Sequence, residues 1–389
     1  MSHVQRWSPF VLGLLWGLIA MGTAQAEVLR FYIGTYTGPD AGGIYQATLD
    51  TETGALGPAS VAGAVKNPSF LAVHPADPTL WYSVCEFVAA DGKPTGGVAA
   101  WRQDPATGRL TLLGQSSSGG AGPCHLTVDR RGKYVLVANY GGGSVASLPL
   151  DPGGNVGPAV DVQQHRGSGT NPNRQQAPHA HSVNLDLAGN FAFVADLGLD
   201  QVLVYRLVPE TGRLMPHDPP AARVTAGAGP RHLAVHPTGK FVYVINELGN
   251  TISVFGYDAQ TGKLTPVQEL GTLPEGFAGE SYTAEVVVHP GGRFVYGSNR
   301  GHDSVAVFEV DAATGRLTAR GHQATGGQTP RNFAIDPTGR WLLAENQKSN
   351  SVVVLAIDGA TGALRETGHR LEVPSPVCIR FTPPAAKSR

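Results

Sequence analysis

The residues with the clearest chemical potential are an arginine and a glutamate sixteen positions apart, Arg231 and Glu247. Arg231 precedes the apolar run 233–236, and Glu247 follows a second run, 241–246, with a Pro-Thr-Gly-Lys turn between the two. Two paired antiparallel strands return to where they began, so both side chains should lie at the same end of a hairpin. A guanidinium beside a carboxylate suits the binding of an anion or the stabilisation of developing negative charge.

A second polar motif is Pro178-His-Ala-His-Ser182, which places His179 and His181 two positions apart. Residues at this spacing point the same way in an extended strand. The two histidines suit a catalytic base or an anion site, and a structural role remains open. A metal is a further alternative, although metal sites need three or four ligands. The polar segment 166–176 before the motif is expected to be a loop near the same site, with a lid as one interpretation.

The segment that holds Arg231 and Glu247 recurs along the chain. Its copies begin at positions 71, 126, 183, 233, 286 and 333. Separations of 47 to 57 residues suit four short strands and their loops in each unit. Hairpin turns of the Asp-x-x-Thr-Gly type recur at Asp50, Asp104, Asp258, Asp311 and Asp358. No comparable run has a helical period.

The two ends of the chain complete the pattern. Residues 377–381 resemble a lone first strand, and residues 31–36 and 43–49 resemble second and third strands that lack one. Joined, they make a seventh unit. The sequence therefore predicts an all-β fold, a seven-bladed β-propeller over 27–384 closed by N- and C-terminal strands that share one blade. An open β-solenoid is the alternative, and 385–389 would be a short tail.

Composition limits the partners of the chain. Its 389 residues include 29 basic and 30 acidic side chains, with a formal charge of −1. Because no long run of one charge occurs, nothing indicates nucleic acid or an anionic membrane as a partner. We also expect a monomer.

The N-terminus has the three regions of a secretory signal peptide. Arg6 precedes the apolar run 11–21, and Ala24-Gln25-Ala26 suits cleavage after Ala26. An uncleaved anchor is the alternative, but the apolar run is short for a membrane span. We therefore predict a signal peptide over 1–26, a periplasmic or secreted protein, and no stable membrane insertion after cleavage.

Three cysteines are too few for a disulfide framework and lack the spacing of metal ligands. Cys85 ends a predicted second strand and Cys124 begins the next unit. They could be neighbours, so a disulfide between them is possible in an oxidising compartment.

Aligning the seven units shows which residues should share one rim of the propeller. The positions before each first strand are Ser69, Cys124, His181, Arg231, Ala284, Arg331 and Val377. The next positions are Phe70, His125, Ser182, His232, Glu285, Asn332 and Cys378. The positions after each second strand are Tyr36, Glu86, Tyr140, Leu197, Glu247, Arg300 and Gln347. A rim of mixed charge around a central axis predicts a ligand site, whereas Arg–Glu pairs that only connect blades are the structural alternative.

Several motifs in fixed order resemble those of a known family. They are Pro178-His-Ala-His-Ser182, Gly-Ala-Gly-Pro-Arg-His at 227–232, Val-Ile-Asn-Glu-Leu at 244–248, Asn299-Arg300, Pro330-Arg331 and Gln347-Lys348-Ser349. The chain resembles the seven-bladed propeller lactonases, which include bacterial 6-phosphogluconolactonase and the fungal 3-carboxy-cis,cis-muconate lactonizing enzyme. The likeness extends over about 30–382. It implies a site of one histidine, two arginines and one glutamate, with no metal or organic cofactor.

Carried over by motif, the implied catalytic residues are Arg231, Arg300, Glu247 and either His181 or His179. Lactone hydrolysis needs a base, oxyanion donors and an acid for the leaving alkoxide. We expect His181 and Glu247 to transfer protons while Arg231 and Arg300 hold the substrate and stabilise charge. The expected substrate-binding residues are His179, His125, Tyr140, Glu86, His232, Arg331 and Gln347.

The substrate and two other functions stay open at this point. An exported protein would meet few phosphorylated sugars, so an unphosphorylated aldonolactone or another carboxylated lactone is a candidate beside a 6-phospho sugar lactone. A non-catalytic envelope propeller that binds a ligand or a protein, and a muconate-type cycloisomerase, are the alternatives to a lactonase.

Overall fold

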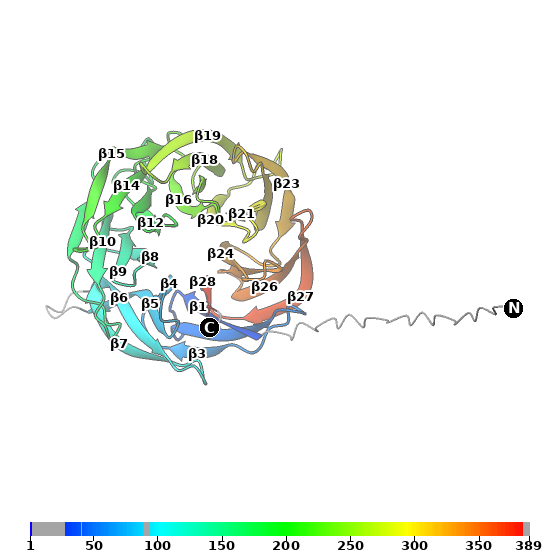
Figure 1. Ribbon diagram of the computed structural model, residues 1–389, viewed down its shortest axis with the longest axis horizontal. Helices are drawn as coiled ribbons and strands as arrows, with labels where there is room; N and C mark the ends of the chain where they lie inside the picture. The colour runs from blue at the N-terminus through cyan, green and yellow to red at the C-terminus, as the bar shows by residue number, and fades with distance from the viewer. Residues whose placement is uncertain (2–27, 40, 89–93, 384–389) are drawn as a thin grey trace.

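The computed structural model describes residues 28–39, 41–88 and 94–383, together with residue 1. Within these residues the chain forms 28 β-strands and no α-helix. The strands make seven four-stranded sheets. The sheets are arranged radially around a central axis (Figure 1). The strands nearest the middle are β28, β4, β8, β12, β16, β20 and β24.

We number the sheets as blades 1 to 7, each given from its inner to its outer strand. Blade 1 is β28 (Pro376–Phe381), β1 (Val28–Thr35), β2 (Ile44–Asp50) and β3 (Ser60–Gly63). Blade 2 is β4 (Leu71–Val73), β5 (Leu80–Val88), β6 (Pro94–Gln103) and β7 (Leu110–Ser117). Blade 3 is β8 (Pro123–Val128), β9 (Tyr134–Asn139), β10 (Ser144–Pro149) and β11 (Asp161–Gln164).

The remaining blades follow in chain order. Blade 4 is β12 (Ala180–Leu185), β13 (Phe191–Asp196), β14 (Gln201–Leu207) and β15 (Leu214–Arg223). Blade 5 is β16 (Pro230–Val235), β17 (Phe241–Asn246), β18 (Thr251–Asp258) and β19 (Lys263–Gly271). Blade 6 is β20 (Tyr282–Val288), β21 (Phe294–Arg300), β22 (Ser304–Val310) and β23 (Leu317–Ala324). Blade 7 is β24 (Pro330–Ile335), β25 (Trp341–Asn346), β26 (Ser351–Ile357) and β27 (Leu364–Glu372).

Blade 1 closes the ring with both ends of the chain. Strand β28 pairs antiparallel with β1, with Phe31 opposite Phe381 and Ile33 opposite Ile379. This confirms the predicted seven-bladed propeller and its closure, and it excludes the open solenoid. Radial closure leaves only short sheet edges, and the inner ones face the central channel.

Packing between blades explains the apolar character of the middle strands. Strands β9, β13 and β17 are buried at every position, because neighbouring blades cover both of their faces. The outer strand β11 instead alternates between half-buried and exposed residues, as does β27 from Glu366 onward. The apolar core therefore lies between adjacent blades, as where Phe193 of blade 4 packs edge-on against Tyr257 of blade 5.

Several of the Asp-x-x-Thr-Gly turns link a blade to its neighbour. In one of them the side chain of Asp311 accepts hydrogen bonds from the backbone N–H groups of Ala313 and Thr314, and Gly315 has a φ of 72°. The carbonyl of Gly315 accepts a hydrogen bond from the hydroxyl of Tyr243 in the preceding blade. Equivalent bonds join Tyr32 to Gly108, Tyr82 to Gly154 and Tyr296 to Gly362.

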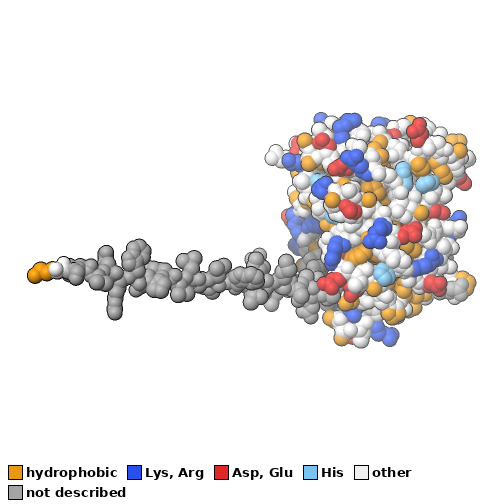
Figure 2. All heavy atoms as spheres, turned by 90° about the vertical axis from the view of Figure 1, so that its right-hand side faces the viewer, with side chains coloured by type: hydrophobic (Ala, Val, Ile, Leu, Met, Phe, Trp, Pro, Cys, Tyr) orange, Lys and Arg blue, Asp and Glu red, His pale blue; other side chains and the backbone are white. Residues whose placement is uncertain are grey.

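Charged side chains of both signs are mixed over the face shown in Figure 2. In the described part of the chain, no helix has the length and hydrophobicity that a membrane span requires. Apart from residue 1, the predicted signal peptide lies outside the described residues, and so does the predicted tail at 385–389.

Candidate active site

Inner strands of several blades begin with a β-bulge, and the bulges position the site. The pairing register skips one residue in each of β8, β12, β16 and β24, namely Cys124, His181, Arg231 and Arg331. A bulged residue has no partner in the strand pairing, and its side chain is redirected. Three of the four line one cavity at an end of the central channel, and the fourth, Arg231, reaches toward the same place.

This mouth cavity has a volume of about 430 Å³, which is within the range of small-molecule sites. Six of the predicted site residues line it: His181, Glu247, Arg300, Arg331, Tyr140 and Glu86. The alignment of the repeats therefore predicted that these six residues lie close together.

Glu247 is the centre of the charge arrangement in the mouth cavity. Its Oε2 atom lies 3.0 Å from Nε of Arg231 and 2.9 Å from Nη2 of Arg300. Its Oε1 atom lies 2.6 Å from Nη2 of Arg174. The predicted Arg231–Glu247 pair is thus confirmed, and three guanidinium groups hold one carboxylate that is only 4% exposed.

The electrostatics of this cluster keep the carboxylate ionised. Burial alone would raise the pKa of Glu247, but the charges of Arg300 and Arg231 and the hydrogen bond from Arg174 together lower it to about 2. Burial lowers the pKa of Arg231 to about 9, with the charges of Arg300 and Arg331 adding to the effect. The cluster is therefore an ionised carboxylate that offsets crowded cations.

Backbone carbonyls fix the positions of Arg231 and Arg300. Nη1 of Arg231 donates to the carbonyl of Ala284 at 2.7 Å, and Nη2 of Arg300 donates to the carbonyl of Thr283 at 2.8 Å. Arg231 is 2% exposed and does not line the cavity, whereas Arg300 does. Arg231 is thus a support for Glu247, and Arg300 is a group that a ligand can touch.

Arg174 was missed by the sequence analysis, because it belongs to the polar loop between β11 and β12 and to no repeat. The next residue, Gln175, is completely buried and donates to the side chain of Asp200 at 2.6 Å. This anchor places Arg174 over the cavity, where it also contacts the hydroxyl of Tyr140 at 3.4 Å. The loop that was expected near the mouth therefore supplies a cation to it.

His181 faces the mouth cavity as a neutral imidazole. Burial lowers its pKa well below 6.5, and the positive charge of Arg231 adds to the effect. Its Nδ1 atom lies 3.8 Å from the sulfur of Cys124, which also contacts the carbonyl of His181 at 3.2 Å. Among the described residues, Nε2 of His181 has no hydrogen-bond partner, so this atom is free to meet a water molecule or a ligand.

Unlike His181, His179 does not line the mouth cavity, although the rings of both residues contact that of Tyr140. The bulge at His181 interrupts the alternation of the strand. The ring of His179 stacks on that of Tyr140 at 4.5 Å between centroids, and its Nδ1 atom lies 3.0 Å from the carbonyl of Tyr140. His179 supports Tyr140 from behind and does not line the cavity.

Other predicted binding residues differ in what they offer to a ligand. Arg331 contacts the hydroxyl of Tyr36 at 3.2 Å and, among the described residues, forms no ion pair. Glu86 is already paired with Lys66 at 3.0 Å. Gln347 does not line the mouth cavity.

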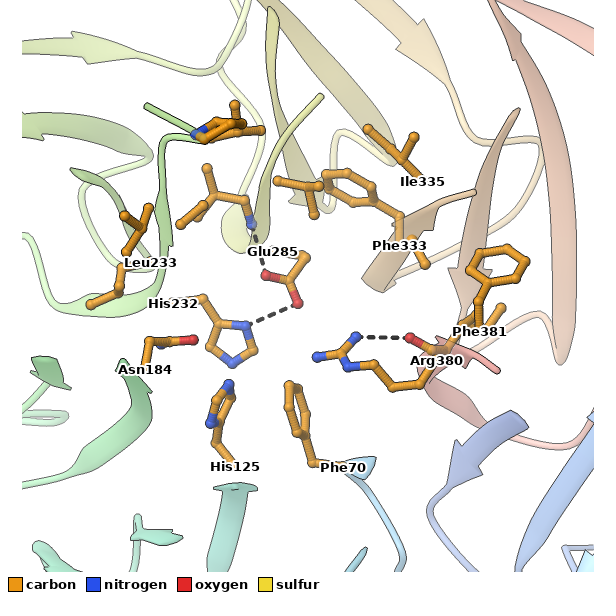
Figure 3. Close-up of a pocket in the computed structure, with 18 of the residues that line it drawn as sticks. Phe70, His125, Asn184, His232, Leu233, Glu285, Phe333, Ile335, Arg380 and Phe381 are labelled. Carbon is orange, nitrogen blue, oxygen red and sulfur yellow. Dashed lines mark hydrogen bonds and ion pairs between the residues drawn. The ribbon is translucent and has the colours of Figure 1, made fainter. Parts of the chain in front are cut away.

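His125 and His232 were expected at the same rim, but they line a second cavity farther along the channel (Figure 3). Each follows a bulged residue, so its side chain points along the channel below the mouth. The His232 ring lies 5.2 Å from the rings of both His181 and His125. These rings form a layer between the two cavities.

The possible disulfide between Cys85 and Cys124 is absent, and both residues are free thiols. Cys85 instead contacts the side chain of Gln115, and burial raises its pKa to about 12. Within the described ranges, no three His, Cys, Asp or Glu side chains gather as a metal site would require.

A closed seven-bladed propeller with an Arg–Glu–His cluster at one mouth has the architecture of the propeller lactonases. The chain belongs to this family: the family described as "Lactonase, 7-bladed beta-propeller" matches residues 30–381. A 6-phosphogluconolactonase of Bacillus subtilis is 37% identical over 354 residues, which cover 90% of this chain and 97% of the relative. The periplasmic gluconolactonase of Pseudomonas aeruginosa is 34% identical, covers 92% of this chain and 99% of its own, and has a TM-score of 0.86.

Proposed function

We propose that this lactonase hydrolyses an aldonolactone, with His181 as the base that activates water. The observation that carries the proposal is the neutral His181 beside a carboxylate that holds three arginines, in one cavity of suitable size. Because its pKa is low, nearly all of His181 is in the basic form at neutral pH. It is a weaker base than a free histidine, but a lactone ester needs less activation than an amide.

The positions of these groups support the following reaction. His181 takes a proton from water as the water oxygen bonds to the lactone carbonyl carbon. Arg300 and Arg174 donate hydrogen bonds to the oxyanion that forms. The bond from this carbon to the ring oxygen then breaks, and the imidazolium returns its proton to that oxygen. The product is an open-chain hydroxy acid, which releases a proton in neutral solution.

We assign Glu247 a positioning role in place of the proton transfer expected from the sequence. A carboxylate with a pKa of about 2 and three guanidinium partners is a poor proton acceptor near neutral pH. Its negative charge instead sets the orientation of Arg300 and Arg174 and offsets their mutual repulsion. Arg231 completes this support from below.

For the substrate we favour an unphosphorylated lactone outside the cytoplasm. The predicted signal peptide supports this, as does the likeness to a protein described as a periplasmic gluconolactonase. Arg331 and Tyr36 at the cavity wall offer hydrogen bonds to ring hydroxyls. The same arginine could hold a phosphate, so phosphorylated and unphosphorylated lactones must be compared directly.

The test is the rate of acid release from glucono-lactone and its 6-phospho form by residues 27–389, followed in a pH-stat against the spontaneous rate. We expect the unphosphorylated lactone to be opened faster, and His181→Asn and Arg300→Gln to remove most of the gain. Equal rates for wild type and both variants would refute the proposal. Ligand binding without turnover would favour a binding propeller, and conversion of a muconate without incorporation of water would favour a cycloisomerase.

A further inference from the structure

The inner strands enclose a second cavity beyond the layer of histidine rings. This channel cavity has a volume of about 440 Å³ and shares no lining residue with the mouth cavity. It is lined by the later parts of the inner strands, such as Leu233–Val235 of β16 and Ile379–Phe381 of β28. The polar side chains of Arg380, Glu285, His232 and His125 point toward one another in its middle (Figure 3).

The repeated sequence explains why the channel cavity is not filled by side chains. Each inner strand has an equivalent position three residues after its bulge or rim residue. In six blades these positions carry side chains without charge: Ala72, Thr127, Asn184, Ala234, Val287 and Ala334. In blade 1 the equivalent residue is Arg380, which extends a guanidinium into the space that the others leave.

Arg380 carries a charge that no carboxylate neutralises directly. Its Nη1 atom donates to the carbonyl of Ile379 at 2.8 Å, and its guanidinium carbon lies 4.5 Å from the centre of the Phe70 ring. Among the described residues, Arg380 forms no ion pair, and its Nε and Nη2 atoms have no acceptor. A guanidinium with free donors in a cavity suits a carboxylate.

The one carboxylate that lines the channel cavity in the described chain is already satisfied. The Oε2 atom of Glu285 lies 3.0 Å from Nδ1 of His232 and also accepts a hydrogen bond from Asn332. Its Oε1 atom accepts the backbone N–H of Val286 at 3.0 Å. Burial alone would raise the pKa of Glu285, but the contact with His232 and the nearby charges of Arg380 and Arg231 lower it, although Arg380 forms no ion pair with Glu285.

The two histidines present complementary hydrogen-bonding atoms. Because Nδ1 of His232 donates to Glu285, its Nε2 carries a lone pair; this atom is buried without a partner in a side chain that is 4% exposed. Because Nδ1 of His125 accepts the N–H of Val183, its Nε2 carries a hydrogen. Burial lowers the pKa of both imidazoles, so both are neutral. An orphan acceptor of this kind calls for a hydroxyl donor.

We propose that the channel cavity is a second ligand site, which binds a small hydroxy acid with an apolar body. The carboxylate accepts hydrogen bonds from Arg380, and the hydroxyl donates to Nε2 of His232. The apolar body packs against Leu233, Ile335 and Phe381, which surround the polar centre. This site does not depend on the function proposed for the mouth cavity.

The experiment is calorimetric titration of the mature protein with mandelate, which has a carboxylate, a hydroxyl and an apolar ring. Phenylacetate lacks the hydroxyl, and mandelamide lacks the charge. We expect mandelate to bind with a Kd at or below about 1 mM, and both analogues to bind at least about tenfold more weakly. A further titration uses gluconate, a polar hydroxy acid of the type that lactone opening produces. It tests whether the channel cavity prefers such a product or an apolar hydroxy acid from another source. Gluconate binding tighter than that of mandelate would overturn the requirement for an apolar body.

Variants locate the binding. We expect Arg380→Gln to weaken mandelate binding at least about tenfold, and Arg331→Gln at the mouth to leave it within about twofold. Ala234→Leu fills the channel cavity without changing a charge, and it should also abolish binding, so the proposal can be tested even if Arg380→Gln does not fold. Circular dichroism confirms folding of each variant. No heat from mandelate at about 10 mM, or unchanged affinity in Arg380→Gln and Ala234→Leu, would overturn the proposal.

Discussion

Replacing Glu247 by glutamine isolates the charge that holds three arginines together. The change keeps the size of the side chain but removes its negative charge, and it turns an amide N–H₂ toward guanidinium groups. Breaking a buried ion pair by removing one partner typically costs about 3–5 kcal/mol. For a chain of this length, such a loss lowers the melting temperature by roughly 4–6 °C.

The same substitution should also disable the site. Without Glu247, Arg300 and Arg174 lose the anion that orients them, so their hydrogen bonds no longer converge on the oxyanion. Loss of one such donor typically lowers kcat by about 10²- to 10³-fold, and we expect at least that for Glu247→Gln. Thermal unfolding and lactone hydrolysis measured on the same preparation give both quantities.

Glu86→Gln is the matched control, because it makes the same chemical change in the wall of the same cavity. The side chain of Glu86 is 44% exposed and pairs with Lys66, and exposed pairs contribute about 1 kcal/mol or less. Glu86→Gln should therefore melt close to the wild type. If Glu247→Gln melts at the same temperature as Glu86→Gln and keeps kcat/KM within about threefold of wild type, the charge arrangement derived for Glu247 is incorrect.

Three further results are expected. Arg174→Gln should lower kcat by about 10²-fold with little change in melting temperature, because Arg174 is one-third exposed and is one of the two proposed oxyanion donors. Arg174→Lys should recover part of the loss, and a change confined to stability would contradict this role. The value of kcat/KM should stay constant as the pH falls from 8 to about 6.5, because only the neutral imidazole of His181 accepts a proton. It should decline only below the lowered pKa of His181. A decline centred at or above pH 6.5 would count against His181 as the base. Glu345 is completely buried, and burial raises the pKa of its carboxyl group well above 4.5 in the folded protein. Its contribution to the free energy of unfolding is therefore largest below pH 4.5 and decreases as the pH rises toward the pKa in the folded state. Urea unfolding should therefore show Glu345→Gln gaining stability relative to wild type as the pH rises, by about 1.4 kcal/mol per unit, whereas a constant difference would contradict a neutral Glu345.

The fold could be predicted because its determinants are repeated. Each copy carries two apolar strands around a tight turn, and the spacing of the copies leaves room for two more strands. The lone strand 377–381 and the incomplete unit at 31–49 could be satisfied only by each other, as the pairing of β28 with β1 confirms. Arg231 and Glu247 were paired by the same logic, since two strands of a hairpin end together.

The parts that could not be predicted depend on irregular backbone. Arg174 belongs to a loop whose position depends on a buried hydrogen bond from Gln175 to Asp200, and no periodic pattern encodes this contact. The separation of His179 from His181 depends on a bulge that the alternation of apolar residues does not reveal. A bulge adds one unpaired residue to a strand and so shifts the pairing register by one position. The sequence does not indicate which residue is left unpaired.

The bulges also explain how one propeller can contain two polar cavities. In a regular strand, Arg231 and His232 would point to opposite faces, and only one could face the channel. The bulge lets Arg231 reach Glu247 at the mouth while His232 reaches Glu285 below it. Because the bulged residue has no partner in the strand pairing, its type is not restricted by packing between blades. The blades therefore supply a constant scaffold, and the chemistry of each cavity depends on residues that the scaffold leaves unconstrained.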